Sequence, residues 1–196
     1  PEMVKMAGGV PKFLDTTEEN DFKFSPEELE NCITAKTRAL VLNTPSNPTG
    51  MVYSEDALRK IAEIAVKHNI YVIMDEIYEK LVYEGKHKDI ATFGEDIKNL
   101  TITVNGMAKA YAMTGWRLGY IGGPRGIIDR MTKVQEYFNS CINTPAQYGA
   151  IYALSHPEFK EQIRAEFEER RKIALEGFAS LKGVVTNQPR GAFYLF

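Results

Sequence analysis

The fold of this 196-residue chain is constrained most by short apolar runs that alternate with longer helix-like stretches. Three of these runs are Ala39–Leu42, Ile70–Met74 and Thr101–Val104. Such runs are typical of strands buried in a parallel sheet, and strands that alternate with helices build sheets of this kind. The pattern predicts an α/β fold with a mostly parallel sheet flanked by helices.

Other segments extend this outline. A helix should begin after Ser25, because a capping serine, a first-turn proline and a glutamate three residues on form a capping box. Ser54 should cap a second helix. Additional strands are expected near Val4–Ala7, Lys12–Leu14 and Leu118–Ile121. The remaining helices are expected over residues 126–140, 145–154 and 157–181.

Composition excludes several classes of protein. A formal net charge of −2 shows no excess of basic residues of the kind that binds nucleic acid or an anionic membrane. No apolar run approaches the roughly 18 residues of a membrane span. Cys32 and Cys141 lack the spacing of a metal site and are too few for a disulfide framework. His68, His87 and His156 are scattered, so no metal site is expected. These features predict a cytoplasmic protein.

Polar residues suited to chemistry follow the three apolar runs. Asn47 lies in the loop after the first run, Asp75 directly follows the second, and Lys109 follows the third. Open α/β sheets bind their ligands outside the carboxyl ends of the strands. We therefore expect these side chains to line one cleft, with Asp75 and Lys109 on opposite sides of a ring-sized gap.

Lys109 and Arg117 together indicate a cofactor. A lysine amine at the end of a strand can form a Schiff base with an aldehyde. Arg117, eight residues later, can hold a phosphate through two parallel charge-assisted hydrogen bonds. An aldehyde and a phosphate on one molecule describe pyridoxal phosphate. Taken alone, Lys109 also fits an ordinary solvated surface lysine.

The segment Asp75–Tyr78 fits the same cofactor. A buried carboxylate needs a cationic or proton-donating partner, and a protonated pyridine nitrogen is such a group. Tyr78 could donate a hydrogen bond to the phenolic oxygen of the ring. Simpler explanations stay open: Asp75 could be a helix N-cap, and Thr44–Gly50, which contains Asn47, could be an ordinary tight loop.

Three linked motifs resemble the class I and II aminotransferases of the aspartate aminotransferase superfamily, which are pyridoxal-phosphate enzymes of fold type I. The motifs are Ser46–Gly50, Asp75–Tyr78, and Lys109 followed by Gly115–Tyr120. Their order, spacing and flanking strands all agree with that family, and three linked motifs are far more specific than one. The resemblance covers essentially the whole chain and is strongest toward the prokaryotic aspartate aminotransferase branch.

The resemblance implies a role for each of these residues. Lys109 would form the Schiff base with pyridoxal 5′-phosphate and, once released, would move the proton between the substrate Cα and the cofactor. Asp75 would pair with the pyridine nitrogen. Asn47 and Tyr78 would hydrogen-bond the phenolic oxygen of the ring. Arg117 would bind the phosphate.

The resemblance also implies a reaction and an organisation. The parent protein would exchange an amino group between an L-amino acid, with aspartate as a candidate, and a 2-oxo acid. Relatives are homodimers, and Asn143 and Thr144 fall where a segment would cross to the partner, although they also fit a simple interhelical loop. The peptide bond between Asn47 and Pro48 should be cis.

Residues 1–182 are expected to form part of a cofactor-binding large domain, and residues 183–196 the start of a small carboxyl-terminal domain. In relatives, the phosphate turn, the aromatic residue stacked on the pyridine ring and the carboxylate-binding arginine lie outside the matching region. The chain alone is therefore expected to be an inactive fragment. Other members of fold type I are C–S lyases, decarboxylases and ligand-sensing domains without catalytic activity, and these remain alternatives.

Overall fold

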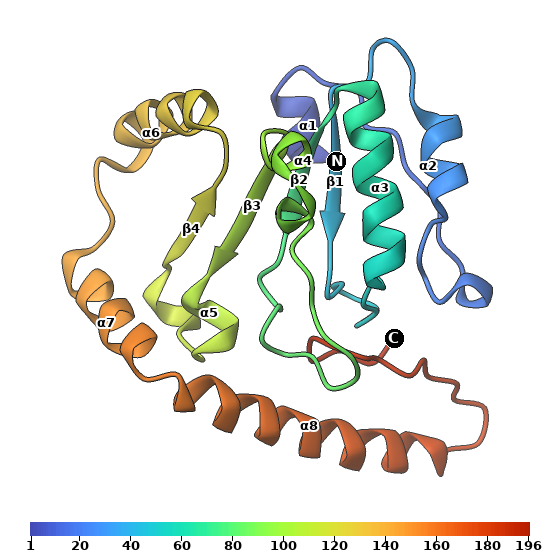
Figure 1. Cartoon of the computed structure of the whole chain (residues 1–196). Helices are drawn as coiled ribbons and strands as arrows, with labels where there is room; N and C mark the ends of the chain where they lie inside the picture. Colours follow the sequence, from blue (N-terminus) through green and yellow to red (C-terminus); the bar gives the residue numbers. More distant parts are fainter.

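The computed structural model describes all residues from Pro1 to Phe196, and a four-stranded sheet forms its centre (Figure 1). The sheet consists, in spatial order, of β1 (Ala39–Asn43), β2 (Tyr71–Asp75), β3 (Thr101–Gly106) and β4 (Gly119–Gly122). The first three strands are parallel, and β4 runs antiparallel to β3. The predicted α/β fold with a mostly parallel sheet is confirmed.

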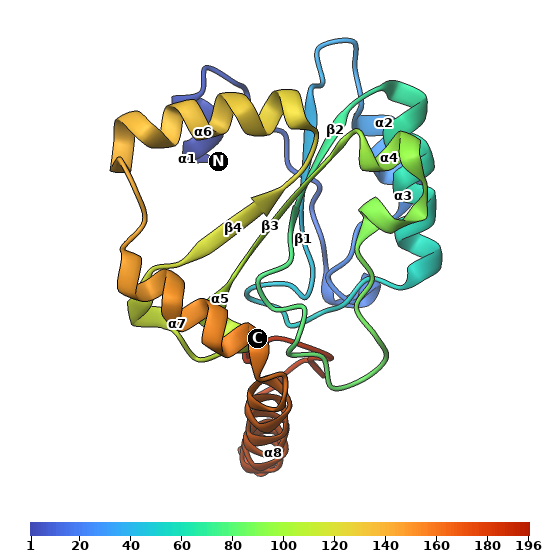
Figure 2. The same ribbon diagram turned by 60° about the vertical axis from the view of Figure 1, so that its left-hand side comes forward.

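One group of helices covers a single face of this sheet, as Figures 1 and 2 show. The group consists of α2 (Pro26–Cys32), α3 (Glu55–His68), η2 (Ile90–Phe93) and α4 (Glu95–Lys98). The strand order β1-β2-β3 advances in one direction, and connections between parallel strands are right-handed. Because direction and handedness stay constant, both crossovers place their helices on the same face.

The second half of the chain lies on the β4 side of the sheet and across its lower end in Figure 1. After the short helices α5 (Met107–Ala110) and η3 (Thr114–Trp116), the longer helices α6 (Arg125–Asn139) and α7 (Thr144–Ser155) lead to α8 (Glu158–Ala179). The bounds of α6, α7 and α8 agree with those of the three predicted helices to within two residues. None of them is long and apolar enough to span a bilayer.

The main core lies between the sheet and the helices that cover it. Leu40 and Leu42 of β1 and Val72 and Met74 of β2 are buried against α3, whereas Val41 is 59% exposed on the other face. Each such side chain contributes about 1.5–3 kcal/mol when fully buried. These two strands therefore bury alternate residues, because helices pack closely against only one of their faces.

Both predicted helix caps are confirmed. The Ser25 hydroxyl accepts a hydrogen bond from the Glu28 backbone amide, and the Glu28 carboxylate accepts one from the Ser25 amide. The Ser54 hydroxyl accepts from the Ala57 amide at the start of α3. These bonds satisfy amide groups that a helix start leaves without partners.

Two predicted strands are wrong. Val4–Ala7 falls in and just after the short helix α1 (Glu2–Met6), and Lys12–Leu14 has no regular structure. A strand needs a neighbour to complete its hydrogen-bond ladder, and β1 pairs only with β2. Without such a neighbour, the backbone polar groups of the first segment form the local hydrogen bonds of α1 instead. The single turn η1 (Glu18–Asn20) follows before α2.

The carboxyl-terminal segment returns to the sheet and packs on the loops that follow β1 and β2. The amides of Arg190 and Gly191 both donate to the Gly50 carbonyl at 2.9 Å, and the Ala192 amide donates to the Leu81 carbonyl at 2.8 Å. Gly50 has φ +66°, which a side chain would strain. This segment therefore contributes side chains to the end of the sheet where the candidate residues lie.

Candidate functional site

The carboxyl ends of β1, β2 and β3 and the start of β4 lie at one edge of the sheet, the lower edge in Figure 1. In the strand register, Asn43 pairs with Asp75, Asp75 pairs with Val104, and Gly106 pairs with Gly119. This register brings the loops that carry the candidate residues to the same edge, as the parallel pattern requires.

The loop after β1 is fastened to the end of β2. The Asn43 side chain donates to the Asp75 carbonyl at 3.1 Å, and its oxygen accepts from the Asn47 amide at 2.7 Å. The bond between Asn47 and Pro48 is cis, as predicted, and so is the bond before Pro45. The two hydrogen bonds of Asn43 hold the start of the loop at the end of β2, and the Asn47 side chain is exposed there.

Asp75 is the half-buried last residue of β2. One carboxylate oxygen accepts a hydrogen bond from the Ile77 amide at 3.2 Å. The residues that follow form turns rather than a helix, so the alternative that Asp75 caps a helix is wrong. No cationic side chain lies within ion-pair distance of its carboxylate, which leaves its charge available to a partner.

Tyr78 lies buried in an aromatic cluster. Its side chain is 3% exposed, its ring meets Phe193 edge-on at 5.3 Å, and its hydroxyl pairs with the Tyr194 hydroxyl at 2.5 Å. Burial raises the pKa of the Tyr78 hydroxyl above its ordinary value; Tyr194 and Asp75 raise that pKa further, and Asn47 lowers it. The hydroxyl therefore stays protonated over the neutral pH range and can act as a donor.

Lys109 lies in α5, directly after β3. Its ammonium nitrogen is 5.0 Å from the centre of the Phe193 ring and 5.5 Å from that of Tyr78. Contacts of this kind are worth about 0.5–1 kcal/mol at exposed sites. No carboxylate lies within ion-pair distance of the amine, so its charge has no anionic partner.

Close backbone packing places the loop that carries Lys109 and Arg117. The Met107 amide donates to the Leu118 carbonyl at 3.1 Å, and a Cβ on Gly106 would lie 2.8 Å from that oxygen. Only glycine fits there. The two ends of the loop are therefore clamped together next to the β3–β4 pair.

Arg117 stands two residues before β4 with φ +53°, an uncommon conformation for a residue with a side chain. Its guanidinium donates to the Thr114 carbonyl at 3.0 Å and has no carboxylate partner. Conformations of this kind cluster at ligand sites, where the surroundings hold them. The guanidinium is exposed and free to bind an anion.

The structure therefore joins the candidate residues to different degrees. The Tyr78 ring faces the Lys109 amine, Asp75 and Asn47 influence the pKa of the Tyr78 hydroxyl, and Arg117 lies on the same loop as Lys109. Phe193 and Tyr194 also belong to the site and were not predicted. The only local signal for them is an aromatic pair after Gly191, because their position depends on how the chain end folds back.

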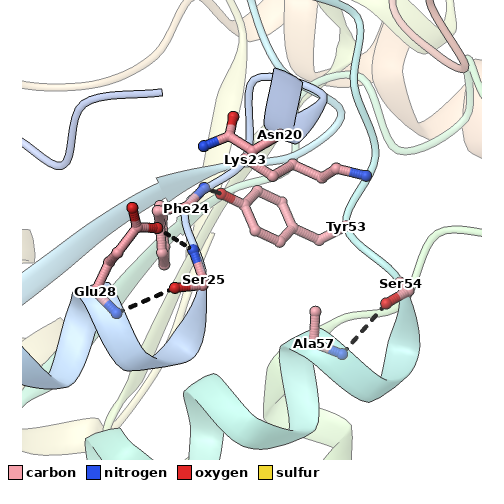
Figure 3. A pocket seen from close by; sticks show the side chains of 8 residues that line it. All are labelled: Asn20, Lys23, Phe24, Ser25, Glu28, Tyr53, Ser54 and Ala57. Carbon is pink, nitrogen blue, oxygen red and sulfur yellow. Dashed lines mark hydrogen bonds between the residues drawn. The ribbon is translucent and has the colours of Figure 1, made fainter. Parts of the chain in front are cut away.

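A separate hollow lies between the starts of α2 and α3 (Figure 3). Its polar groups already have partners: the Tyr53 hydroxyl accepts from the Phe24 amide at 3.1 Å, and the two capping serines bind their helices. No candidate residue lines this hollow. It is a junction between two helix starts rather than a second site.

Comparison with known proteins gives a consistent result. A model of the family described as aminotransferase class I and II matches residues 1–196. The chain is 44% identical over 198 residues to an aspartate aminotransferase of Geobacillus stearothermophilus, with 100% of this chain and 50% of that protein covered. It is 45% identical over 197 residues to an asparagine–oxo-acid transaminase of Streptococcus mutans, again covering 100% and 50%.

A solved structure of Thermus thermophilus aspartate aminotransferase with maleate has the same fold, with a TM-score of 0.93 and 43% identity. The match covers 100% of this chain and 51% of that one. The chain thus spans about half the length of the curated relatives it matches. With the family model matching from the first residue to the last, the chain belongs to the class I and II aminotransferases.

Proposed function

We propose that the whole protein transfers an amino group between an L-amino acid and a 2-oxo acid with pyridoxal 5′-phosphate as cofactor. One observation carries this proposal: Asp75, Lys109 and Arg117 lie on neighbouring loops of one sheet edge, and none has an oppositely charged partner. A pyridine nitrogen, an aldehyde and a phosphate on one molecule complement these three groups. The residues present fit the cofactor.

Each side chain would have a distinct task. When bound, the cofactor supplies an electron sink for the amino acid. The Asp75 carboxylate would keep the pyridine nitrogen protonated, and the Arg117 guanidinium would hold the phosphate through paired hydrogen bonds. Asn47 and Tyr78 would donate to the phenolic oxygen of the ring.

Lys109 would hold the cofactor and move the proton. Its amine would take a proton from the substrate Cα and pass it to the cofactor. Its ammonium nitrogen lies 5.0 Å from the centre of the Phe193 ring and 5.5 Å from the centre of the Tyr78 ring.

We propose four-carbon amino acids with a polar end group, aspartate and asparagine, as the amino donors. The names of the similar proteins from Geobacillus and Streptococcus support this choice, and both relatives cover the whole chain. Residues 1–182 would then form part of the cofactor-binding large domain, and residues 183–196 would begin the small domain.

We further propose that the whole protein is a homodimer. Asn143 caps α7 through its side-chain oxygen, which accepts from the Ala146 amide at 3.0 Å, and so fixes the turn between α6 and α7. Large apolar side chains stand exposed on both helices, among them Tyr137, Phe138 and Ile151. Sedimentation of the full-length protein at micromolar concentration should give twice the subunit mass; a single subunit mass would contradict the dimer.

A cofactor titration followed by a half-reaction tests the function. Full-length protein should develop the absorbance of a lysine-bound pyridoxal phosphate and lose it when aspartate is added, with formation of the 2-oxo acid. Lys109→Ala should reduce amino transfer by at least about a hundredfold, the lower range for loss of a general base. Lys98→Ala, which removes an exposed amine in α4, is the matched control.

The reaction products distinguish an aminotransferase from the alternative functions. Carbon dioxide release would indicate a decarboxylase, and cleavage of a C–S bond a lyase. Cofactor binding without turnover of any donor would indicate a ligand-sensing domain. Retention of full activity by Lys109→Ala would overturn the assignment of the site.

A further inference from the structure

A second cluster of ionisable side chains lies beside the candidate site. Glu76 follows Asp75 directly, Glu79 comes three residues later, and His87 lies in the loop beyond. One potential ligand atom from each of these three residues lies within 4.8 Å of the others. The Glu76 amide donates to the Val104 carbonyl at 2.9 Å, which fixes this cluster to the end of β3.

Two members of the cluster carry buried side-chain atoms that lack hydrogen-bond partners. Glu76 is 2% exposed and the His87 side chain 8%, yet one carboxylate oxygen of Glu76 and both ring nitrogens of His87 have no hydrogen-bond partner. Buried polar atoms without partners are costly and uncommon in folded proteins. These atoms therefore point to a ligand that would satisfy them.

The spacing of the Glu76 and His87 atoms suits a shared cation. The His87 Nε2 atom is 3.0 Å from the Glu76 Oε1 atom, but the ring N–H is not directed at that oxygen. Ligand atoms about 3 Å apart are spaced as around an ion with bonds of about 2.0–2.2 Å.

We propose that Glu76, Glu79 and His87 bind a divalent transition-metal ion of the zinc type. One imidazole nitrogen and two carboxylate oxygens suit Zn²⁺, whereas Mg²⁺ and Ca²⁺ prefer sites made only of oxygen. The two carboxylates balance the charge of the ion. Three protein ligands leave a fourth position for water. This proposal does not rest on the proposed function.

The ion would stabilise the carboxyl ends of β2 and β3. The Glu79 carboxylate also accepts from the Asn105 side chain at 2.9 Å, and the Asn105 oxygen accepts from the Gly106 amide at 2.7 Å. These bonds connect the cluster to the loop that carries Lys109. Lys80, 3.1 Å from the second Glu79 oxygen, is the only cation that now competes for this carboxylate.

Calorimetric titration with Zn²⁺ tests the proposal. The chain should first be treated with a chelator and should carry Cys32→Ser and Cys141→Ser, because both thiols are exposed and thiolates are zinc ligands. We expect one Zn²⁺ per chain and much weaker binding of Mg²⁺. His87→Gln and Glu79→Gln should each weaken zinc binding at least about tenfold.

A second histidine provides the matched control. The His68 ring lies 3.3 Å from the Glu30 carboxylate in an exposed pair without a third ligand, so His68→Gln should leave the affinity unchanged. Absence of zinc binding in the parent, or equal affinity in His87→Gln, would overturn the proposal. Should His87→Gln fail to fold by circular dichroism, Glu79→Gln decides the outcome, because glutamine keeps the bond from Asn105.

Discussion

At the scale of single residues, the hydroxyl of Tyr78 is controlled by a residue 116 positions away in the sequence. Tyr194 pairs with it at 2.5 Å, and the two rings meet edge-on with their centres 5.7 Å apart. When Tyr194 donates to the Tyr78 oxygen, the Tyr78 proton is left for another acceptor, as the proposed role requires. The proposed donor to the cofactor is thus positioned by the end of the chain.

Tyr194→Phe should lower the pKa of the Tyr78 hydroxyl. Tyr194 raises that pKa, second only to burial, so its removal leaves a smaller upward shift. Titration of the chain labelled at the tyrosine Cζ carbon, followed by NMR, measures the change. Tyr148→Phe, which removes a hydroxyl from a side chain that is 71% exposed, is the control. An unchanged Tyr78 titration in Tyr194→Phe would contradict the positioning role.

At the scale of elements, one hydrogen bond joins the starts of α2 and α3. The Tyr53 hydroxyl, next to the α3 cap, accepts from the Phe24 amide, next to the α2 cap (Figure 3). The two rings also pack together with their centres 5.4 Å apart. Burial raises the pKa of Tyr53 to about 12, because the ionised hydroxyl would lose its hydration. The contact between the starts of α2 and α3 should therefore weaken at alkaline pH, where Tyr53 ionises.

Tyr53→Phe should destabilise the fold near neutral pH and reduce its sensitivity to alkali. Loss of the acceptor leaves the Phe24 amide unsatisfied, which costs about 1–3 kcal/mol. An unfolded tyrosine has a pKa of about 10. Because the folded value is higher, the stabilising contribution of Tyr53 is complete below pH 10 and is lost as the pH rises through about 12.

Urea unfolding measured from pH 7 to 12 tests this expectation. The free energy of unfolding should fall less steeply above pH 10 in Tyr53→Phe than in the parent. Some slope should remain, because burial also raises the pKa of Tyr83 to about 12. Tyr137→Phe, with an 85% exposed side chain, should match the parent. Identical slopes in the parent and Tyr53→Phe would refute the assignment.

At the scale of the whole molecule, the carboxyl-terminal segment closes the lower end of the sheet in Figure 1. It depends on close backbone contact at Gly50 and Gly191. A Cβ on Gly50 would lie 2.8 Å from the Gly191 carbonyl oxygen, and a Cβ on Gly191 would lie 2.9 Å from the Leu81 carbonyl oxygen. The same docking brings Phe193 and Tyr194 to Lys109 and Tyr78.

Gly50→Ala should therefore detach this segment and destabilise the chain by more than about 1 kcal/mol, since alanine at φ +66° is strained and also clashes. Gly177→Ala is the matched control, because it lies in α8 with open space around it and should stabilise by roughly 0.5–1 kcal/mol. Thermal unfolding measures both effects. Limited proteolysis should cut Gly50→Ala faster after residue 183; equal cutting in both variants would count against the docking role.

Much of the fold follows from local pattern. The strands after residue 38, the caps at Ser25 and Ser54 and the cis bond at Pro48 were all predicted, because each depends on neighbouring residues or on a motif that the family shares. The first two predicted strands failed for the opposite reason. Whether Val4–Ala7 pairs as a strand depends on a neighbour that only the topology could supply, and the topology supplies none.

The sequence by itself determined the order of the motifs and the edge of the sheet at which Asn47, Asp75 and Lys109 meet, because parallel strands end on the same side. Only the tertiary structure decided that Tyr194 pairs with Tyr78 and that His87 lies against Glu76. Periodicity and capping report contacts between residues a few positions apart. Contacts between distant segments depend instead on how loops return to the sheet, and no local pattern encodes that path.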